Sequence, residues 1–174
     1  MNTKMTEMES RFCHGCYIWK VSNYRKLREE AVSGNGTVLH SPGFYSSMYG
    51  YRLCIRLNLN GVDSATGKHL SLFVHFMKGE FDDLLPWPFR GRITLSILDQ
   101  NEHHEKRQHL SEVLNAKPKL AAFQKPITHR NHKGFGYMEY ASIWLIDSNY
   151  VQNDTLFIRA LVEPDVDLMH ERPF

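Results

Sequence analysis

The sequence lacks the features that would place the chain in a membrane or outside the cell. No apolar run approaches the roughly 20 residues of a membrane-spanning helix, and residues 1–12 contain no apolar stretch of the secretory-signal kind. Cysteine is scarce: Cys13, Cys16 and Cys54 are an odd set, which does not build the disulfide framework of a small secreted domain. We therefore expect a cytoplasmic protein with reduced thiols.

An excess of charge of one sign is also missing. The 174 residues contain 21 lysines and arginines against 19 aspartates and glutamates, which leaves a formal net charge of +2. This balance provides no broad basic surface, so we expect neither nucleic-acid binding nor membrane insertion. A chain of this length buries a hydrophobic core without disulfides or metals, and one domain is the starting expectation.

Few residues have the spacing of a metal site. Cys13 and Cys16 resemble half of a zinc site, but a structural zinc ion needs about four ligands, and no second pair is spaced to complete it. The stretch 102–109 holds three histidines among charged residues. We interpret it as a solvated loop, with metal or phosphate capture as the alternative. No metal and no cofactor are expected.

Short strands dominate the hydrophobic pattern. In residues 51–59 the odd-numbered side chains are apolar, while Arg56 falls on the other, solvent-facing side. Residues 69–77 alternate in the same way and place Phe73 outward. Five more segments are rich in β-branched and aromatic residues, as strands are: 17–22, 37–40, 93–99, 137–146 and 155–163.

Turn-forming residues separate these segments, and helices are few. Prolines and glycines at 41–43, 60–61 and 86–88 mark chain reversals. Apolar residues at helical spacing predict one short helix within residues 24–31 and another within residues 110–114. Many short strands with few helices predict an all-β antiparallel sandwich.

The segment 133–137, Lys-Gly-Phe-Gly-Tyr, is the most informative candidate for a binding site. Gly134 and Gly136 leave one face of an extended segment without side chains, so that another backbone can approach it. Such an edge favours β-strand addition by a peptide, with Phe135 and Tyr137 as the walls of a pocket. The alternative is a bulge or tight turn packed on aromatic residues, and the spacing leaves both open.

Arg56 and Phe73 are expected on the outer faces of neighbouring strands. The planar cationic head of Arg56 suits an acidic ligand group or the face of an aromatic ring. The alternatives are an arginine in a surface salt bridge and a phenylalanine covered by a loop. The pair is a candidate for binding only in combination with other evidence.

Two other classes of function have candidate residues. Cys54 and His75 fall on the same predicted outer face, as the nucleophile and base of a cysteine-dependent enzyme would, but no third group orients them. Trp87 and Trp144 are candidate flat platforms for a carbohydrate, although Trp87 lies between two prolines and is expected to be packed. We expect a binding domain and not an enzyme.

Seven motifs then follow one another in order: HSPGFY at 40–45, GYRLC at 50–54, SLFVH at 71–75, LPWPF at 85–89, ILDQ at 97–100, AKP at 116–118 and KGFGY at 133–137. Together they resemble the meprin-and-TRAF-homology (MATH or TRAF-C) domain of the tumour-necrosis-factor-receptor-associated factors, the TRAF family, and within it the sixth-member type. The resemblance covers residues 13–163. It implies an eight-stranded antiparallel β-sandwich with one or two short helices. Residues 1–12 are then an N-terminal tail and remnant of a coiled coil, and residues 164–174 a C-terminal tail.

The resemblance also implies a function. Domains of this type bind the cytoplasmic tails of receptors, signalling adaptors or kinases in TNF-receptor and Toll-type signalling, toward NF-κB and stress-kinase pathways and innate immunity. Their ligands carry the motif Pro-x-Glu-x-x-(aromatic or acidic) and add as a strand to a sheet edge. A MATH domain for substrates or scaffolds with a different motif is the alternative.

Full-length family members contain further elements. They carry a RING, zinc fingers and a coiled coil, form homotrimers and act as RING-type ubiquitin ligases. Any ligase activity would belong to those elements, and we expect this domain alone to be a monomer or a weak trimer.

Matching positions carry the family's ligand contacts onto this sequence. Arg56 matches the arginine that meets the last residue of the motif. The segment 134–137 matches the edge and the pocket for the motif's proline, to which Leu114 contributes in place of the family's methionine.

Other matching positions concern the glutamate of the motif and the borders of the groove. Ala121 and Ala122 stand where backbone amides receive that glutamate, with Ala121 in place of a leucine. Phe73 and Lys133 flank the groove, and His132 stands where a proline is expected. These departures leave the motif preference open.

Overall fold

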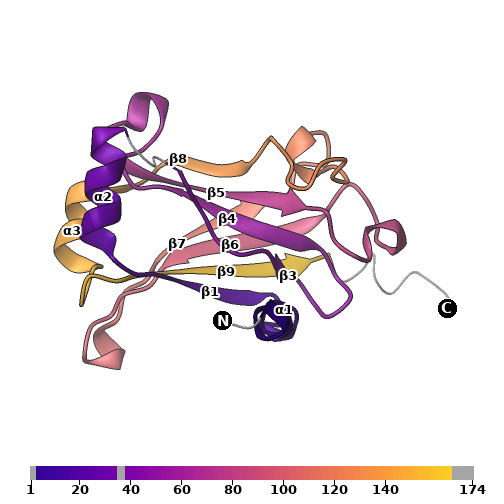
Figure 1. Ribbon diagram of the computed structural model, residues 1–174, viewed down its shortest axis with the longest axis horizontal. Coiled ribbons are helices and arrows are strands. Elements are labelled where there is room, and N and C mark those ends of the chain that lie inside the picture. Colours follow the sequence, from indigo (N-terminus) through magenta and orange to yellow (C-terminus); the bar gives the residue numbers. More distant parts are fainter. Residues whose placement is uncertain (1–2, 35–37, 166–174) are drawn as a thin grey trace.

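The computed structural model describes residues 3–34 and 38–165, which form two antiparallel sheets packed face to face (Figure 1). One sheet has the order β1 (Cys16–Val21), β9 (Leu156–Pro164), β6 (Gly91–Ile97) and β7 (Leu110–Asn115). The other has the order β2 (Leu39–His40), β4 (Arg52–Asn58), β5 (His69–Met77) and β8 (Phe135–Ser142), with β3 (Phe44–Tyr45) beside β4. All named pairs are antiparallel, which confirms the predicted sandwich.

The nine strand segments of the described chain correspond to eight strands, because β2 and β3 are two pieces of one interrupted edge. Both pair with β4, β2 with its second half and β3 with its first. Between them the Ser41 N–H donates to the Ile55 carbonyl at 2.9 Å, and the Ile55 N–H donates to the Ser41 hydroxyl at 2.8 Å. The serine side chain therefore keeps the hydrogen-bond ladder continuous across the break.

The core lies between the two sheets. Side chains 51, 53, 55, 57 and 59 are each at most 2% exposed, as the alternation predicts. Strand β6 contributes Ile93, Leu95 and Ile97 from the other sheet. Tyr140 of β8 joins the layers, because its buried hydroxyl lies 2.6 Å from the Leu95 carbonyl and 2.8 Å from that of Leu110.

Helices lie around the sandwich, two of them together at one end (Figure 1). The described residues form α1 (Thr3–Phe12), α2 (Tyr24–Ser33), α3 (Ile143–Asn149) and four 3₁₀ turns, η1 (Asp63–Ala65), η2 (Asp82–Leu84), η3 (His104–Lys106) and η4 (Ala121–Phe123). Helix α2 confirms the prediction for residues 24–31. In the described residues no helix is both long and apolar enough to cross a membrane.

Helix α1 lies beside β3 (Figure 1). The Arg11 guanidinium stands 4.6 Å from the centre of the Tyr45 ring and pairs with Glu80. Some predictions fall outside the described residues. They concern residues 1–2 of the expected N-terminal tail, residue 37 of the expected strand 37–40, and residues 166–174 of the expected C-terminal tail.

Two element predictions are wrong. Residues 110–114 do not form a helix but belong to β7, all of which pairs with β6. The spacing was misleading because Leu110 and Leu114, four residues apart, lie on the same face in a strand as well as in a helix. The expected strand 137–146 ends at Ser142, and α3 follows. Ile143 and Ile146 are buried there at helical spacing, while Trp144 is 74% exposed.

Replacement of Ser41 by alanine tests the bridging hydroxyl. Ser41→Ala leaves the buried Ile55 N–H without its acceptor, and we expect a loss of about 1–3 kcal/mol in the free energy of unfolding. Chemical denaturation measures it, with Ser148→Ala on the exposed side of α3 as the control. Equal stability of the two variants would show that the ladder does not need this hydroxyl.

Candidate functional site

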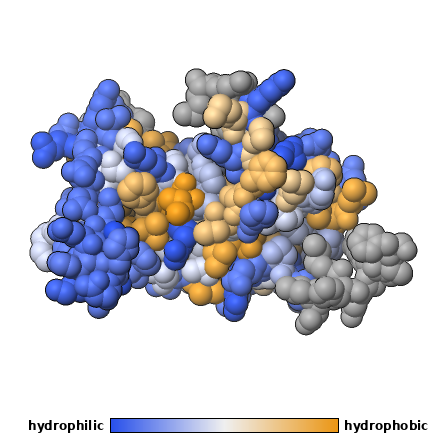
Figure 2. Space-filling view, turned by 90° about the horizontal axis from the view of Figure 1, so that it is seen from below, coloured by the Kyte–Doolittle hydropathy of each residue, from blue (hydrophilic) through white to orange (hydrophobic). Residues whose placement is uncertain are grey.

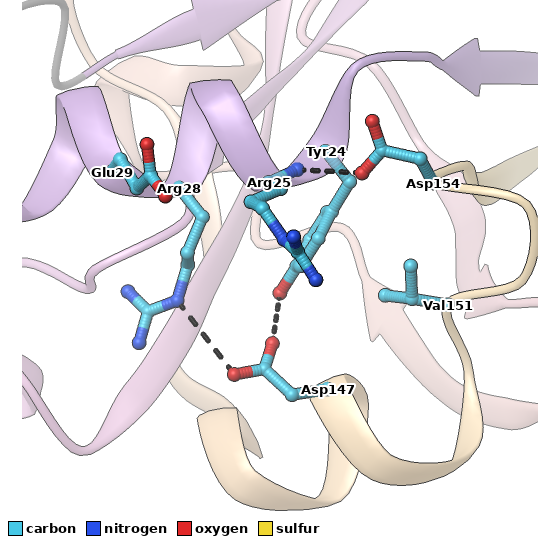
Figure 3. Close-up of a pocket in the computed structure, with 7 residues that line it drawn as sticks. All are labelled: Tyr24, Arg25, Arg28, Glu29, Asp147, Val151 and Asp154. Carbon is cyan, nitrogen blue, oxygen red and sulfur yellow. Dashed lines mark hydrogen bonds and ion pairs between the residues drawn. The ribbon is translucent and has the colours of Figure 1, made fainter.

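A large cavity of about 730 Å³ lies beside α2 and α3, but its two aspartates are already engaged (Figure 3). Asp147 accepts a hydrogen bond from the Tyr24 hydroxyl at 2.5 Å and lies 4.0 Å from the Arg28 guanidinium. Asp154 accepts from the Arg25 N–H at 2.8 Å and so holds the start of α2. The protein itself uses both carboxylates, and none of the site residues predicted from the sequence lines this cavity.

The predicted site residues gather instead around the edge of β8. Strand β8 is the last of its sheet: β5 pairs with one side of it, and no described strand pairs with the other. Phe73 lies opposite Gly136, with Leu72 opposite Tyr137. An open edge presents N–H and C=O groups to which an extended peptide can add.

The two glycines of this edge are required by the protein's own packing. A Cβ on Gly136 would lie 2.1 Å from the Leu72 carbonyl oxygen, and one on Gly134 would lie 2.5 Å from Nε2 of His75. The expectation that a ligand backbone fills this bare face is therefore wrong, because β5 and His75 occupy it. The glycines let β8 lie close against β5 while the opposite edge stays open.

Phe135 and Tyr137 of β8 contact η4 and β7. The Phe135 ring lies 5.1 Å from that of Phe123, and the Tyr137 hydroxyl donates to the Val113 carbonyl at 3.3 Å. Leu114 follows Val113 in β7 and is only 2% exposed. The two rings therefore lie beside η4 and β7, while Leu114 is a core residue and not part of the surface.

The turn η4 contains Ala121 and Ala122, and its Phe123 ring contacts Phe135 of β8. Among the described residues, neither alanine N–H donates a hydrogen bond, as expected at the start of a helical turn. The Asn131 side chain fixes the turn: its Nδ2 donates to the Gln124 carbonyl at 3.1 Å and lies 3.4 Å from the Ala121 carbonyl. Two free amides are therefore held in place by a residue that the sequence did not single out.

On the outer face of the sheet, Arg56 lies over Phe73. The two residues face each other across β4 and β5, and the guanidinium carbon is 4.1 Å from the ring centre. This is cation–π geometry. Both side chains are half-buried, less open than predicted. Burial, and then the charge of Arg130, lower the pKa of Arg56, and its Nε is buried with no hydrogen-bond partner among the described residues.

The loop of residues 128–132 covers the part of this face around His75. The Lys78 N–H donates to the His129 carbonyl at 3.0 Å, and the Asn131 N–H donates to the Phe76 carbonyl at 2.8 Å. His75 Nδ1 lies 2.7 Å from the Asn131 carbonyl, which can only accept, so Nδ1 carries the proton. The face expected to be open to solvent is therefore partly closed.

Cys54 and His75 lie opposite each other under this loop, 1% and 3% exposed. Burial raises the pKa of the Cys54 thiol and lowers the pKa of His75 to about 4. A nucleophilic cysteine needs the reverse shift of its thiol. Together with the burial, these shifts argue against a cysteine-dependent enzyme.

A metal site and a carbohydrate platform gain little support from the structure. No group of three or more metal-ligating side chains comes together within residues 3–34 and 38–165, which include Cys13, Cys16 and the stretch 102–109. The Trp87 ring centre lies 5.0 Å from that of Tyr51, whereas the Trp144 side chain is exposed.

A cavity of about 440 Å³ opens beside Arg56. We call it the basic pocket; its lining residues are Val38, His40, Arg56, His75, Thr128, His129, Arg130, Asn131 and His132. Two arginines and four histidines line it, and no carboxylate does. Sequence reasoning singled out Arg56 and His132 but missed Arg130 and His40. Lys133, next to the pocket, is exposed.

Membership in one family accounts for this fold and edge. The chain belongs to the TRAF/meprin, MATH domain family, whose model matches residues 36–159. The resemblance seen in the motifs is thereby confirmed. A MATH domain of the TRAF type is a protein-interaction domain without a catalytic centre.

Particular relatives refine the assignment. The chain is similar to TNF receptor-associated factor 6 of Xenopus tropicalis, with 43% identity over 175 residues that cover 99% of this chain and 31% of the relative. The human TNF receptor-associated factor 6 is 42% identical over 170 residues, which cover 97% of this chain and 32% of the relative. The chain thus spans about a third of the length of these relatives.

A solved structure agrees with the fold. Notothenia coriiceps TRAF5 matches with a TM-score of 0.84 at 32% identity, over 92% of this chain and 78% of that chain.

The buried His75 predicts acid sensitivity. The pKa of His75 is about 4 in the folded protein and about 6.5 in the unfolded chain. Its contribution to the free energy of unfolding is therefore complete above pH 6.5 and is lost as the pH falls toward 4. Burial is the main cause that lowers the pKa of His75, and the nearby Arg56, His40 and Arg130 lower it further. Between pH 7.5 and 5.0 we expect a loss of about 2 kcal/mol from this group.

Denaturation at the two pH values, on the unmodified protein and on His75→Gln, measures this loss. The glutamine side chain has an amide N–H donor and does not titrate. His104→Gln, on exposed η3, is the control and should behave like the unmodified protein. An equal loss in His75→Gln would assign the acid sensitivity to other groups.

Proposed function

We propose that this domain is an adaptor module that recruits cytoplasmic receptor tails, signalling adaptors or kinases by adding their Pro-x-Glu-x-x-(aromatic or acidic) segments to the β8 edge. The observation that carries the proposal is the open edge of β8, which has two kinds of candidate contact near it. Arg56 lies over Phe73 on the outer face of the sheet, and η4, with the free amides of Ala121 and Ala122, contacts Phe135 of β8 through Phe123.

In this proposal, each part of the motif would have its own contact. The proline would fit between Phe135 and Tyr137 above Leu114. The glutamate would accept hydrogen bonds from the two amides of η4, and the last residue would meet Arg56. A short peptide loses much conformational entropy on binding, so we expect micromolar or weaker affinity.

The cellular setting of the proposal is the cytoplasm. There the domain would act in TNF-receptor or Toll-type signalling toward NF-κB, within a longer protein of which residues 13–163 are the MATH domain. Homologues named as TNF receptor-associated factors support this setting.

Helix α1 supports the proposal that the longer protein is a homotrimer. Met5, Met8 and Phe12 are 60%, 56% and 48% exposed, and their spacing of three and then four is that of a coiled-coil seam. Figure 2 looks at the side where α1 and β1 lie and shows hydrophobic surface across its middle. Ile18 of β1 is likewise 51% exposed.

Sedimentation over a wide concentration range tests the seam. We expect a weak shift from monomer toward trimer at high concentration and its loss in Met8→Glu, because a charge cannot enter the seam unpaired. A monomer at every concentration would remove α1 from the proposal.

Calorimetric titration with a motif peptide tests the groove. Arg56→Ala and Tyr137→Ala should each weaken binding by roughly 1–3 kcal/mol, as interface anchors do. A peptide with alanine in place of the motif's glutamate should lose a similar amount, because the η4 amides are then unused.

Arg25→Ala is the matched control, since Arg25 is an exposed arginine on α2 that lines the other cavity. Thermal unfolding shows whether each variant is folded. Absence of binding by the unmodified protein, or equal binding by all variants, would reject this motif and this groove.

A further inference from the structure

The basic pocket carries positive charge that the protein does not neutralise. Among the described residues, neither Arg56 nor Arg130 forms an ion pair, whereas Arg11, Arg92 and Lys125 do. The cavity beside α2 shows the opposite arrangement, since its aspartates already hold the protein's own groups. Charge left without a partner in a cavity is typical of a ligand-binding site.

The two arginines are close enough to act on the same groups. Burial, and then Arg130 and Arg56, lower the pKa of His40, and burial, and then Arg130, lower that of Arg56. Like charges that converge in a half-buried space destabilise the free protein, and a bound anion would relieve this repulsion.

The pocket also offers several hydrogen-bond donors. Nε of Arg56 is buried without a partner, and a neutral imidazole at His40, His129 or His132 still presents one N–H. His75 is not among these donors, because its Nδ1 proton serves the Asn131 carbonyl. A phosphate group, with three strong acceptor oxygens and nearly two negative charges, matches such a set better than a carboxylate does.

The pocket lies beside the groove. His40, Arg56, Phe73 and Gly136 stand opposite one another across β2, β4, β5 and β8. A side chain from a peptide at the β8 edge would pass over Phe73 and meet Arg56 and the pocket behind it.

From this charge and geometry, and on the basis of the proposed function, we infer that the basic pocket binds the phosphate of a phosphorylated side chain in the peptide held by the β8 edge. Phosphorylation at the last position of the motif would therefore strengthen binding through Arg56 and Arg130.

Titration with four peptides that differ only at the last motif position tests the inference. They carry phenylalanine, glutamate, phosphoserine or phosphotyrosine, in a buffer of low salt without phosphate. At least one phosphopeptide should bind about tenfold more tightly than the phenylalanine peptide, the gain expected from one or two charge-assisted hydrogen bonds. Inorganic phosphate at millimolar concentration should reduce the gain.

Variants assign the gain to the pocket. Arg130→Gln should reduce it to about twofold or less, while Arg130→Lys, which keeps the charge but not the planar head, should retain part of it. Arg25→Gln, which removes one exposed charge elsewhere, should leave it unchanged. His132→Asn is a second test that changes only an exposed side chain, and a smaller reduction is expected.

The outcomes separate the two proposals. Binding of the phenylalanine and glutamate peptides without any gain from phosphate would overturn the phosphate subsite and leave the groove standing. A gain that survives in Arg130→Gln would also overturn it, since the phosphate would then lie elsewhere. If no peptide binds, both the groove and the subsite fail.

Discussion

The close contact of β8 with β5 is the constraint on which the candidate site depends. It is permitted only because Gly134 and Gly136 have no side chain, since a Cβ at either position would enter the ring of His75 or the backbone of β5. With β8 at this distance, the preceding loop runs beside the end of β5 and hydrogen-bonds to it through His129 and Asn131. The same loop covers the outer face, forms one wall of the basic pocket and, through the Asn131 amide, holds η4.

The sequence allowed the layers of the fold to be predicted because burial alternates strictly along the central strands. The parity of residues 51–59 predicts their core side correctly, and it also places Arg56 and Phe73 together on the other face. The same reasoning fails for residues 110–114, where two leucines four residues apart fit the repeat of a strand as well as that of a helix. It also fails for the outer face, because alternation cannot tell water from a covering loop.

The site could be predicted only where its residues stand on strands or in a recognisable motif. Arg56, Phe73 and the segment 133–137 belong to this group. Arg130 and Asn131 do not, because their loop has no regular hydrophobic pattern. Its position depends on backbone hydrogen bonds to a strand more than fifty residues earlier in the chain. The sequence could not reveal why both glycines are needed, because the groups that occupy the space beside them, His75 at Gly134 and the β5 backbone at Gly136, are remote in sequence.

The way in which the loop 128–132 is attached has a consequence for how such a domain can diversify. Its attachment to β5 uses the main chain of His129 and Asn131, while the side chains of His129, Arg130 and His132 line the cavity without making those hydrogen bonds. Ligand preference is therefore partly separable from scaffold integrity. A combinatorial library at these three positions should yield folded domains with new selectivities, much as a loop grafted on a rigid frame does.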